Sequence, residues 1–211
     1  PIKKNDQFLQ SLPGGVKSDG RNEPTGGAVY VRWGRKTCPG NATLLYSGVA
    51  GGTFYSTKGG GTNYQCLPWE PEWGKHTDGL TSGAYMHGAE YDVNTASSPF
   101  RKTNFAGNLY QYSVPCAVCH VTDRQVKVMI PAKKQCPTGW TREYHGYLCT
   151  GGDIYHQSTF ECVDEEPEVI EGTPGNENGA LFFNVEAACG HSLPCPKYVH
   201  GWALTCVVCT K

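Results

Sequence analysis

The cysteines constrain the fold of this chain more than any other feature of its sequence. Eleven of its 211 residues are cysteine. In a reducing compartment thiols at this density oxidise or bind metal, whereas in an oxidising compartment they pair into disulfides. Two pairs have CxxC spacing, Cys116 with Cys119 and Cys206 with Cys209. A four-cysteine zinc site is one interpretation, but zinc-binding CxxC pairs usually lie within about 20 residues of each other. These two pairs are far apart, so we expect disulfides and no bound metal.

The chain consists of two similar halves. Short motifs recur in the same order: Cys38-Pro39 as Cys136-Pro137, Tyr46-Ser47-Gly48 as Tyr144-His145-Gly146, Gly51-Gly52 as Gly151-Gly152, Cys66 as Cys162 within C-x-x-x-E-P-E, Gly88-Ala89 as Gly179-Ala180, and Cys116-x-x-Cys119 as Cys206-x-x-Cys209. Colinear matches of this kind indicate a tandem duplication. We place the first repeat at 28–121 and the second at 126–211.

The texture of each repeat is that of β structure. Apolar and polar residues alternate over 28–33 and 125–130, and the segments 109–114 and 202–208 also have strand character. The 27 glycines favour many tight turns between short strands. Residues 1–27 are polar and rich in glycine, which is typical of a loosely ordered arm. We therefore predict an all-β, disulfide-rich fold in which two similar β subdomains pack as one body.

Eight of the cysteines are equivalent between the repeats. They are Cys38, Cys66, Cys116 and Cys119 in the first, and Cys136, Cys162, Cys206 and Cys209 in the second. No thioredoxin-like βαβ pattern surrounds the CxxC pairs, so we expect each of their cysteines to bond elsewhere in its own repeat. Cys189 and Cys195 are close enough in sequence to close a small loop. Cys149 is left over, either as a buried free thiol or as the cysteine of an intermolecular disulfide.

Several of these motifs together resemble a known family. YVRWGRKTCPG, GGGTNYQCLP, SVPCAVC, TFECVDEEPE and LTCVVCTK are similar to the noncollagenous C-terminal domain of sponge and other invertebrate short-chain, spongin-type collagens. The likeness covers roughly residues 28–211. A fainter one, in Cys136-Pro-Thr-Gly139, is to the duplicated noncollagenous domain of basement-membrane collagen. The resemblance implies an extracellular, disulfide-stapled β domain capable of self-association.

Composition and motifs exclude several classes of function. The net charge of −1 predicts no broad basic surface for nucleic acid, and the apolar runs are too short to span a membrane. The chain has no G-x-S-x-G, HExxH or dinucleotide-binding motif, so we expect no enzyme and no catalytic residues. The sequon at Asn41 lies in a predicted surface turn. Together with the cysteines, it indicates a secreted glycoprotein.

One acidic run carries a possible cation or sugar chemistry. Asp164, Glu165, Glu166 and Glu168 follow Cys162 closely. Such carboxylates can ligate calcium or act in pairs on glycosidic bonds, although a run of this kind is more often a solvated loop. Calcium is the one cofactor that we consider here, and no EF-hand pattern accompanies it.

Aromatic and polar residues gather in the first repeat around the stretch YSTKGGGTNYQCLPWEPEW. A sugar site needs planar rings to stack on a pyranose and a few fixed polar groups to bind its hydroxyls. The candidate glycan-binding residues are Tyr55, Asn63, Tyr64, Trp69, Glu70, Trp73, His76 and Asp78. The second repeat offers Tyr155, His156, Glu161 and Asp164 instead, without a tryptophan at the matching positions.

We therefore expect a secreted, non-enzymatic, lectin-like protein whose partners are glycans or matrix glycoproteins. It would act as a multivalent homo-oligomer, with a Cys149-linked dimer as one form, because multivalency raises avidity without new contacts. The alternative is a structural or assembly domain of extracellular matrix in which the same aromatics form subunit contacts. A calcium-dependent binding module is the third hypothesis.

Overall fold

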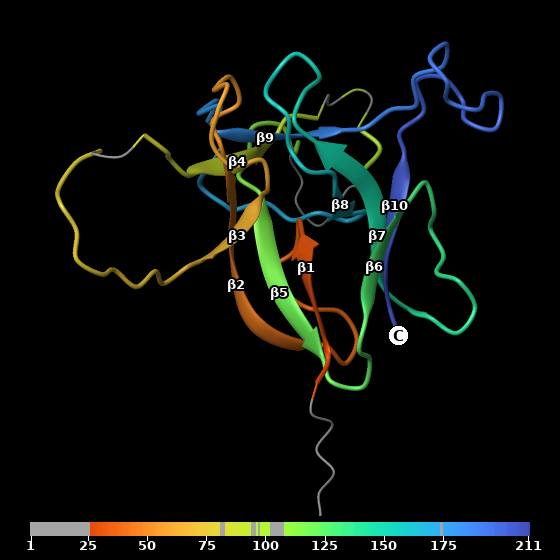
Figure 1. Ribbon diagram of the computed structural model, residues 1–211, viewed down its shortest axis with the longest axis horizontal. Helices are drawn as coiled ribbons and strands as arrows, with labels where there is room; N and C mark the ends of the chain where they lie inside the picture. The colour runs from red at the N-terminus through yellow and green to blue at the C-terminus, as the bar shows by residue number, and fades with distance from the viewer. Residues whose placement is uncertain (1–25, 81–82, 94–95, 97, 102–107, 174) are drawn as a thin grey trace, which may run out of the picture.

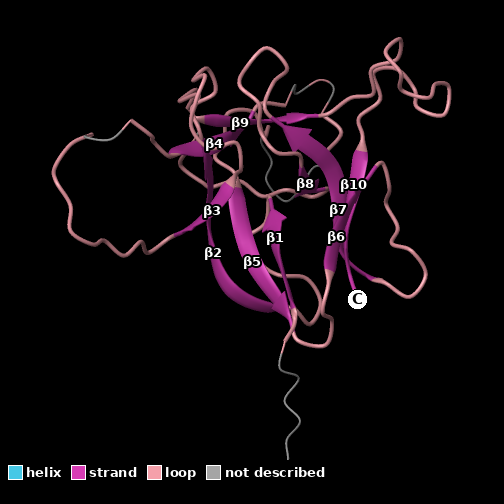
Figure 2. Cartoon of the chain, viewed as in Figure 1, coloured by secondary structure: helices cyan, strands magenta, loops and turns pink. Residues whose placement is uncertain are grey.

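The computed structural model describes residues 26–80, 83–93, 96, 98–101, 108–173 and 175–211. Over these residues the protein is all-β, with ten strands joined by loops and turns and no helix (Figures 1 and 2). The strands are β1 Ala28–Trp33, β2 Thr43–Gly52, β3 Gln65–Pro68, β4 His87–Tyr91, β5 Pro115–Val121, β6 Lys127–Pro131, β7 Thr141–Thr150, β8 Glu161–Asp164, β9 Ala180–Asn184 and β10 Thr205–Thr210. Five disulfides link them and their loops. The predicted disulfide-rich, all-β fold is confirmed.

Of the four predicted strands, one has the bounds that we predicted, two begin later in the chain, and one is not a strand. The strand predicted over 28–33 is β1 residue for residue, while β6 and β10 begin two and three residues later than predicted. The segment 109–114 is not a strand. Tyr110 and Gln111 form a turn there, with Gln111 at a φ of 66° and the Tyr112 amide donating to the Leu109 carbonyl oxygen. That left-handed backbone conformation is incompatible with an extended strand.

The same antiparallel pairings occur in both halves of the chain. In the first half, β5 pairs with β1 and with β2, and β2 also pairs with β3. In the second half, β10 pairs with β6 and with β7, and β7 also pairs with β8. The full order is β6-β10-β7-β8-β1-β5-β2-β4-β9, and β9 pairs with β7 as well. No helix of the described residues is long and apolar enough to cross a membrane.

The two halves are joined by a strand pair made of matched segments. β4 and β9 run parallel with Ala89 opposite Ala180 and Tyr91 opposite Phe182, which is the register in which the two sequences match. Phe182 is fully buried and stacks on Tyr64 of the first half, with ring centroids 4.0 Å apart. Burial of one such side chain stabilises a fold by about 1.5–3 kcal/mol. The halves therefore share a core.

The disulfides join equivalent cysteines in each half. Two connect the turns before β2 and β7 to the second cysteine of the CxxC pair, as Cys38–Cys119 and Cys136–Cys209. Two others connect β3 and β8 to its first cysteine, as Cys66–Cys116 and Cys162–Cys206. Because side chains alternate along a strand, cysteines three residues apart point to opposite faces. Each CxxC strand is thus fixed on both of its faces.

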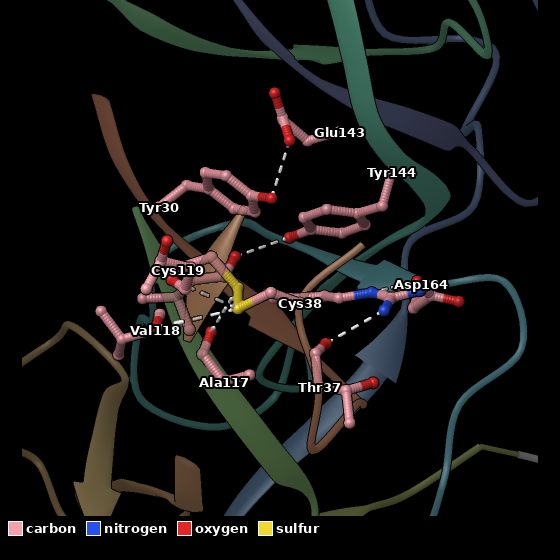
Figure 3. Close-up of a disulfide and its surroundings, with 12 residues drawn as sticks. Tyr30, Thr37, Cys38, Ala117, Val118, Cys119, Glu143, Tyr144 and Asp164 are labelled. Atoms are coloured by element: carbon pink, nitrogen blue, oxygen red, sulfur yellow. Dashed lines mark hydrogen bonds and ion pairs between the residues drawn. A yellow bond between two sulfur atoms is a disulfide. The ribbon is translucent and has the colours of Figure 1, made fainter. Parts of the chain in front are cut away.

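Polar contacts between the halves surround the Cys38–Cys119 disulfide (Figure 3). The Tyr30 hydroxyl donates to the Glu143 carboxylate at 2.8 Å, and the two residues come from different halves. Arg32 and Asp164 form an ion pair at 2.7 Å that also crosses between halves. Both partners of that pair are largely shielded from water, so the removal of one would leave a poorly solvated charge.

One glycine in each half permits the close approach of a neighbouring strand. A β-carbon on Gly48 would lie 1.7 Å from the Leu67 carbonyl oxygen, and one on Gly146 would lie 1.8 Å from that of Val163. Those distances are far below van der Waals contact with a backbone atom that cannot rotate away. The glycine of the repeated Tyr-x-Gly motif is therefore required by the spacing between β2 and β3, and between β7 and β8.

We predict that Gly146→Ala lowers the free energy of unfolding by at least about 2 kcal/mol, because the added methyl group forces β7 and β8 apart. Gly88→Ala is the matched control, since a β-carbon there meets no atom within 4 Å. It should change stability by no more than about 0.5 kcal/mol. Urea denaturation with the disulfides intact measures both. Equal stability of the two variants would contradict the packing described here.

Candidate functional site

An open cleft lies between two matched loops. The loop that joins β2 to β3 and the loop that joins β7 to β8 lie side by side at the upper end of the molecule in Figure 1. Between them is an open cleft of about 490 Å³. Its lining residues are Ser56, Thr57, Lys58, Gly59, Gly60, Gly61, Thr62, Ile154, Tyr155, His156 and Gln157. Both halves of the chain thus contribute to one site.

Backbone hydrogen bonds hold the two loops together. The Thr159 amide donates to the Thr62 carbonyl oxygen at 3.0 Å, and the His156 amide donates to that of Tyr55 at 3.4 Å. The rings of Tyr55 and Tyr155 meet edge to face, with centroids 4.7 Å apart. Main-chain bonds at this junction do not depend on side chains, so the relative position of the two cleft walls is set by the fold.

The imidazole of His156 also spans the two loops. Its Nε2 lies 3.1 Å from the Thr53 carbonyl oxygen, and its Nδ1 lies 2.9 Å from that of Gln157. Carbonyl oxygens only accept hydrogen bonds, and a neutral imidazole has a single N–H to donate. A protonated ring satisfies both contacts, while a neutral ring satisfies one. The side chain is therefore held by the cleft walls and acts as part of them.

The glycine-rich loop gives the first wall its shape. Thr53 Oγ1 donates to the Gly61 carbonyl oxygen at 2.6 Å, which closes the loop on itself. Gly60 has a φ of 96°, and a β-carbon there would lie 2.8 Å from that hydroxyl oxygen. Glycine is required at this position for both reasons. The three glycines carry no side chains that would cover their main-chain groups, and a β-carbon on Gly59 or Gly61 would lie in open space with no atom within 4 Å.

The chemistry of the cleft is mixed. Ser56, Thr57 and Thr62 bring hydroxyl groups, which both donate and accept hydrogen bonds. Ile154, 80% exposed, brings an apolar surface beside the ring of Tyr155. Lys58 adds a positive charge, and no Asp or Glu stands among the lining residues. The cleft therefore offers hydrogen-bonding groups, one apolar surface and one positive charge.

The structure places two of the predicted sugar-binding residues, Tyr55 and Asn63, next to this cleft, and a third, Tyr64, in the core. The Tyr55 ring packs against the ring of the lining residue Tyr155. Asn63 is exposed and directly follows the lining residue Thr62. Tyr64 is buried, stacks on Phe182, and donates its hydroxyl hydrogen to the Leu181 carbonyl oxygen at 2.6 Å. A ring packed in this way belongs to the core, and it does not line the cleft.

The other five predicted residues lie on a different loop. Trp69, Glu70, Trp73, His76 and Asp78 are all exposed between β3 and β4, where the chain projects away from the strands (Figure 1). Trp73 is 81% exposed. None of the five lines the cleft. They form a second exposed surface, which we call the β3–β4 loop.

The structure engages the acidic run in ion pairs. Glu168 lies 3.4 Å from Arg35, and Glu165 lies 3.4 Å from Arg101 and 3.0 Å from His145. Within the described part of the chain, no three His, Cys, Asp or Glu side chains gather closely enough to hold a metal ion. The run therefore joins the two halves electrostatically, and it brings no carboxylate into the cleft.

Asn41 lies in the turn before β2 and is exposed. Its side-chain oxygen accepts one hydrogen bond, at 3.3 Å from Arg124 Nη2. The residue is accessible to a glycosyl donor, as the sequon requires. The turn is fixed by the Ala42 amide, which donates to the Pro39 carbonyl oxygen at 3.2 Å.

The structure favours one of the two interpretations of Cys149. Its side chain is 1% exposed, and its thiol contacts the Tyr147 carbonyl oxygen at 3.6 Å. Burial raises the pKa of the Cys149 thiol well above its ordinary value, so the reactive thiolate is scarce at neutral pH. A thiol in this position packs as a small apolar group. Cys189 is bonded to Cys195, which closes the small loop predicted from their spacing.

The comparison with known protein families gives no assignment, since no family model matches this chain. Sequence reasoning alone named Tyr155 and His156 as a weaker copy of the site in the first repeat. It missed that the two copies meet, and it missed the hydroxyl-bearing residues Ser56, Thr57 and Thr62. The matching motifs Gly51-Gly52 and Gly151-Gly152 were the available signal, because they begin the two loops that form the cleft.

We predict that iodoacetamide at pH 8 leaves Cys149 unmodified in the native protein and labels one thiol per chain after denaturation without reductant. The reason is burial, which hides the sulfur and raises the pKa of the thiol. Intact-mass spectrometry before and after denaturation measures the labelling. Rapid native labelling, or a dimer on non-reducing gels that Cys149→Ala removes, would support the intermolecular disulfide instead.

Proposed function

We propose that this protein is a secreted, non-enzymatic, carbohydrate-binding protein whose glycan site is the cleft between Ser56–Thr62 and Ile154–Gln157. The observation that carries the proposal is the composition of the cleft walls, which combine hydroxyl groups, bare main chain and one apolar side. Glycan recognition needs this combination, because a pyranose has hydroxyl groups at its rim and apolar C–H faces.

The charge of the cleft narrows the class of glycan. Among the lining residues Lys58 is the only Lys or Arg, and there is no Asp or Glu. An acidic saccharide, carrying a carboxylate or a sulfate, gains attraction that a neutral one lacks. The cleft is open to water, so salt should screen this attraction. We therefore propose acidic glycans, free or on matrix glycoproteins, as the preferred ligands.

The disulfides are compatible with the extracellular location that we propose. Five of them close the fold, and bonds of this kind persist in oxidising environments. Extracellular glycans are available to a protein of that location. The exposed Asn41 is consistent with passage through a glycosylating pathway.

A second candidate function, assembly within extracellular matrix, is favoured by a separate observation. Leu44, Leu45 and Tyr46 are consecutive and 40–52% exposed on β2. Over Thr43–Ser47 this strand pairs with β5 alone, because β3 and β4 pair only with Gly48–Gly52. An exposed apolar strand edge is a template for association with another chain. This surface suits the self-association that the resemblance to collagen domains implies.

We predict that the cleft variants Tyr155→Ala and Lys58→Ala weaken glycan binding several-fold, by loss of the apolar wall and of the positive charge respectively. The Lys58 variant should lose its effect at about 1 M salt, where charges are screened over a few ångströms. Glycan arrays that carry neutral and acidic saccharides identify the ligand, and calorimetry measures affinity. Tyr110→Ala and Lys75→Ala are matched controls with exposed side chains outside the cleft.

The β3–β4 loop supplies the competing site. If Trp73→Ala abolishes binding while both cleft variants bind normally, the glycan site is on that loop and the cleft assignment is wrong. If no glycan of either class binds, glycan binding itself is wrong. A sizing measurement then tests assembly, which predicts an oligomer that Leu45→Glu dissociates by placing a charge on the apolar edge.

A further inference from the structure

A second cavity, separate from the cleft, lies between β1 of the first half and β6, β7, β8 and β10 of the second half. Its volume is about 170 Å³. The rings of Trp33, Tyr64 and Tyr144 line it, and each of these residues is at most 5% exposed. Met129 of β6 adds a polarisable apolar group. The inner part of the cavity is therefore apolar and aromatic, which favours the hydrocarbon part of a ligand.

Two side chains of opposite charge stand on the walls of the same cavity. Glu161 opens β8, and Lys127 opens β6. Lys127 and Met129 are two residues apart on one strand, so both side chains point to the same face. Among the described residues, Lys127 forms no ion pair with any carboxylate. The two charges therefore do not neutralise each other through direct contact.

The carboxyl group of Glu161 is oriented by neighbouring donors. Its Oε2 accepts a hydrogen bond from Trp33 Nε1 at 3.0 Å, and its Oε1 accepts one from Thr159 Oγ1 at 3.2 Å. Burial raises the pKa of the carboxyl above its ordinary value, against the lowering effect of these donors and of Lys127. A cation brought next to Glu161 would offset this cost of burial.

The size of the cavity limits the ligand. A protein cavity of about 150 Å³ holds benzene, so one of 170 Å³ holds roughly seven or eight non-hydrogen atoms. A small cation would be attracted by Glu161 and repelled by Lys127. A small anion would be attracted by Lys127 and repelled by Glu161. A ligand with both charges and a short apolar group matches every wall. Free aliphatic α-amino acids are molecules of this kind and size.

We propose that this cavity is a binding site for a small aliphatic α-amino acid, with its ammonium group at Glu161, its carboxylate at Lys127 and its side chain among the three aromatic rings. The site is independent of the glycan cleft, since the two share no lining residue. Binding would join β1 of the first half to β6 and β8 of the second. It would therefore stabilise the contact between the halves.

The test uses the whole oxidised protein with L-valine as the probe. Isobutylamine and isobutyrate serve as comparison ligands, because each has the same apolar group but only one of the two charges. Calorimetry should show valine binding at least about tenfold more tightly than either one. In ¹⁵N spectra, valine should shift the indole N–H signal of Trp33, whose nitrogen donates to Glu161.

Two variants separate the roles of the charges. Glu161→Gln and Lys127→Gln should each weaken valine binding at least about tenfold, and each should abolish its advantage over one comparison ligand. Lys127 is exposed, so its variant should fold even if that of Glu161 does not. Lys58→Gln and Glu70→Gln, on the cleft and the β3–β4 loop, are the matched controls and should bind valine normally.

Binding should also weaken as the pH falls through the raised pKa of Glu161, because protonation removes the negative charge that attracts the ammonium group. The other titratable groups on the cavity walls are Lys127, Tyr64 and Tyr144. Burial raises the pKa of both tyrosines above the ordinary value, so neither tyrosine changes charge in that range. Three results would each overturn the proposal: no valine binding at concentrations up to about 10 mM, equal binding of valine and isobutylamine, or unchanged valine binding by Lys127→Gln.

Discussion

The rest of the structure depends on the pair of disulfides that fixes each CxxC strand. In β5, Cys116 is bonded to Cys66 on one face and Cys119 to Cys38 on the other, and β10 repeats this arrangement. Each strand is thereby tied to the turn that precedes its long partner and to the short strand beyond that partner. In a chain-entropy account, each of these closures stabilises the fold by about 2–4 kcal/mol. The disulfides therefore stabilise a fold that consists of short strands and many loops.

The function that we propose follows from this frame and from how the halves meet. β4 and β9 pair in parallel through matched residues. Contacts between the two halves, such as the ion pair of Arg32 with Asp164, fix the position of one half relative to the other. The two matched loops are therefore brought together at one end of the molecule, where they form a cleft that neither half has alone. The glycine-rich insertion shapes one wall and Ile154–Gln157 shapes the other. The asymmetry between the halves is thus an asymmetry between the two walls of one site.

The sequence predicted the features that local patterns encode. The alternation over 28–33 predicted β1, and the close spacing of Cys189 and Cys195 predicted the small loop that their disulfide closes. One strand prediction was wrong, because the segment 109–114 is interrupted by a turn at Gln111. The packing of Tyr64 could not be predicted from local sequence, since its ring stacks on Phe182 from the other half. The cleft could not be predicted, since its walls lie about a hundred residues apart and no periodicity records that they touch.

The most direct test of the account is hydrogen–deuterium exchange of the native protein with and without its tightest-binding glycan. If the glycan occupies the cleft, amides of both 56–62 and 154–157 should exchange more slowly in its presence, because one ligand covers both loops. Protection confined to residues 69–80, with no change in either cleft loop, would contradict the claim that the two halves build one binding site.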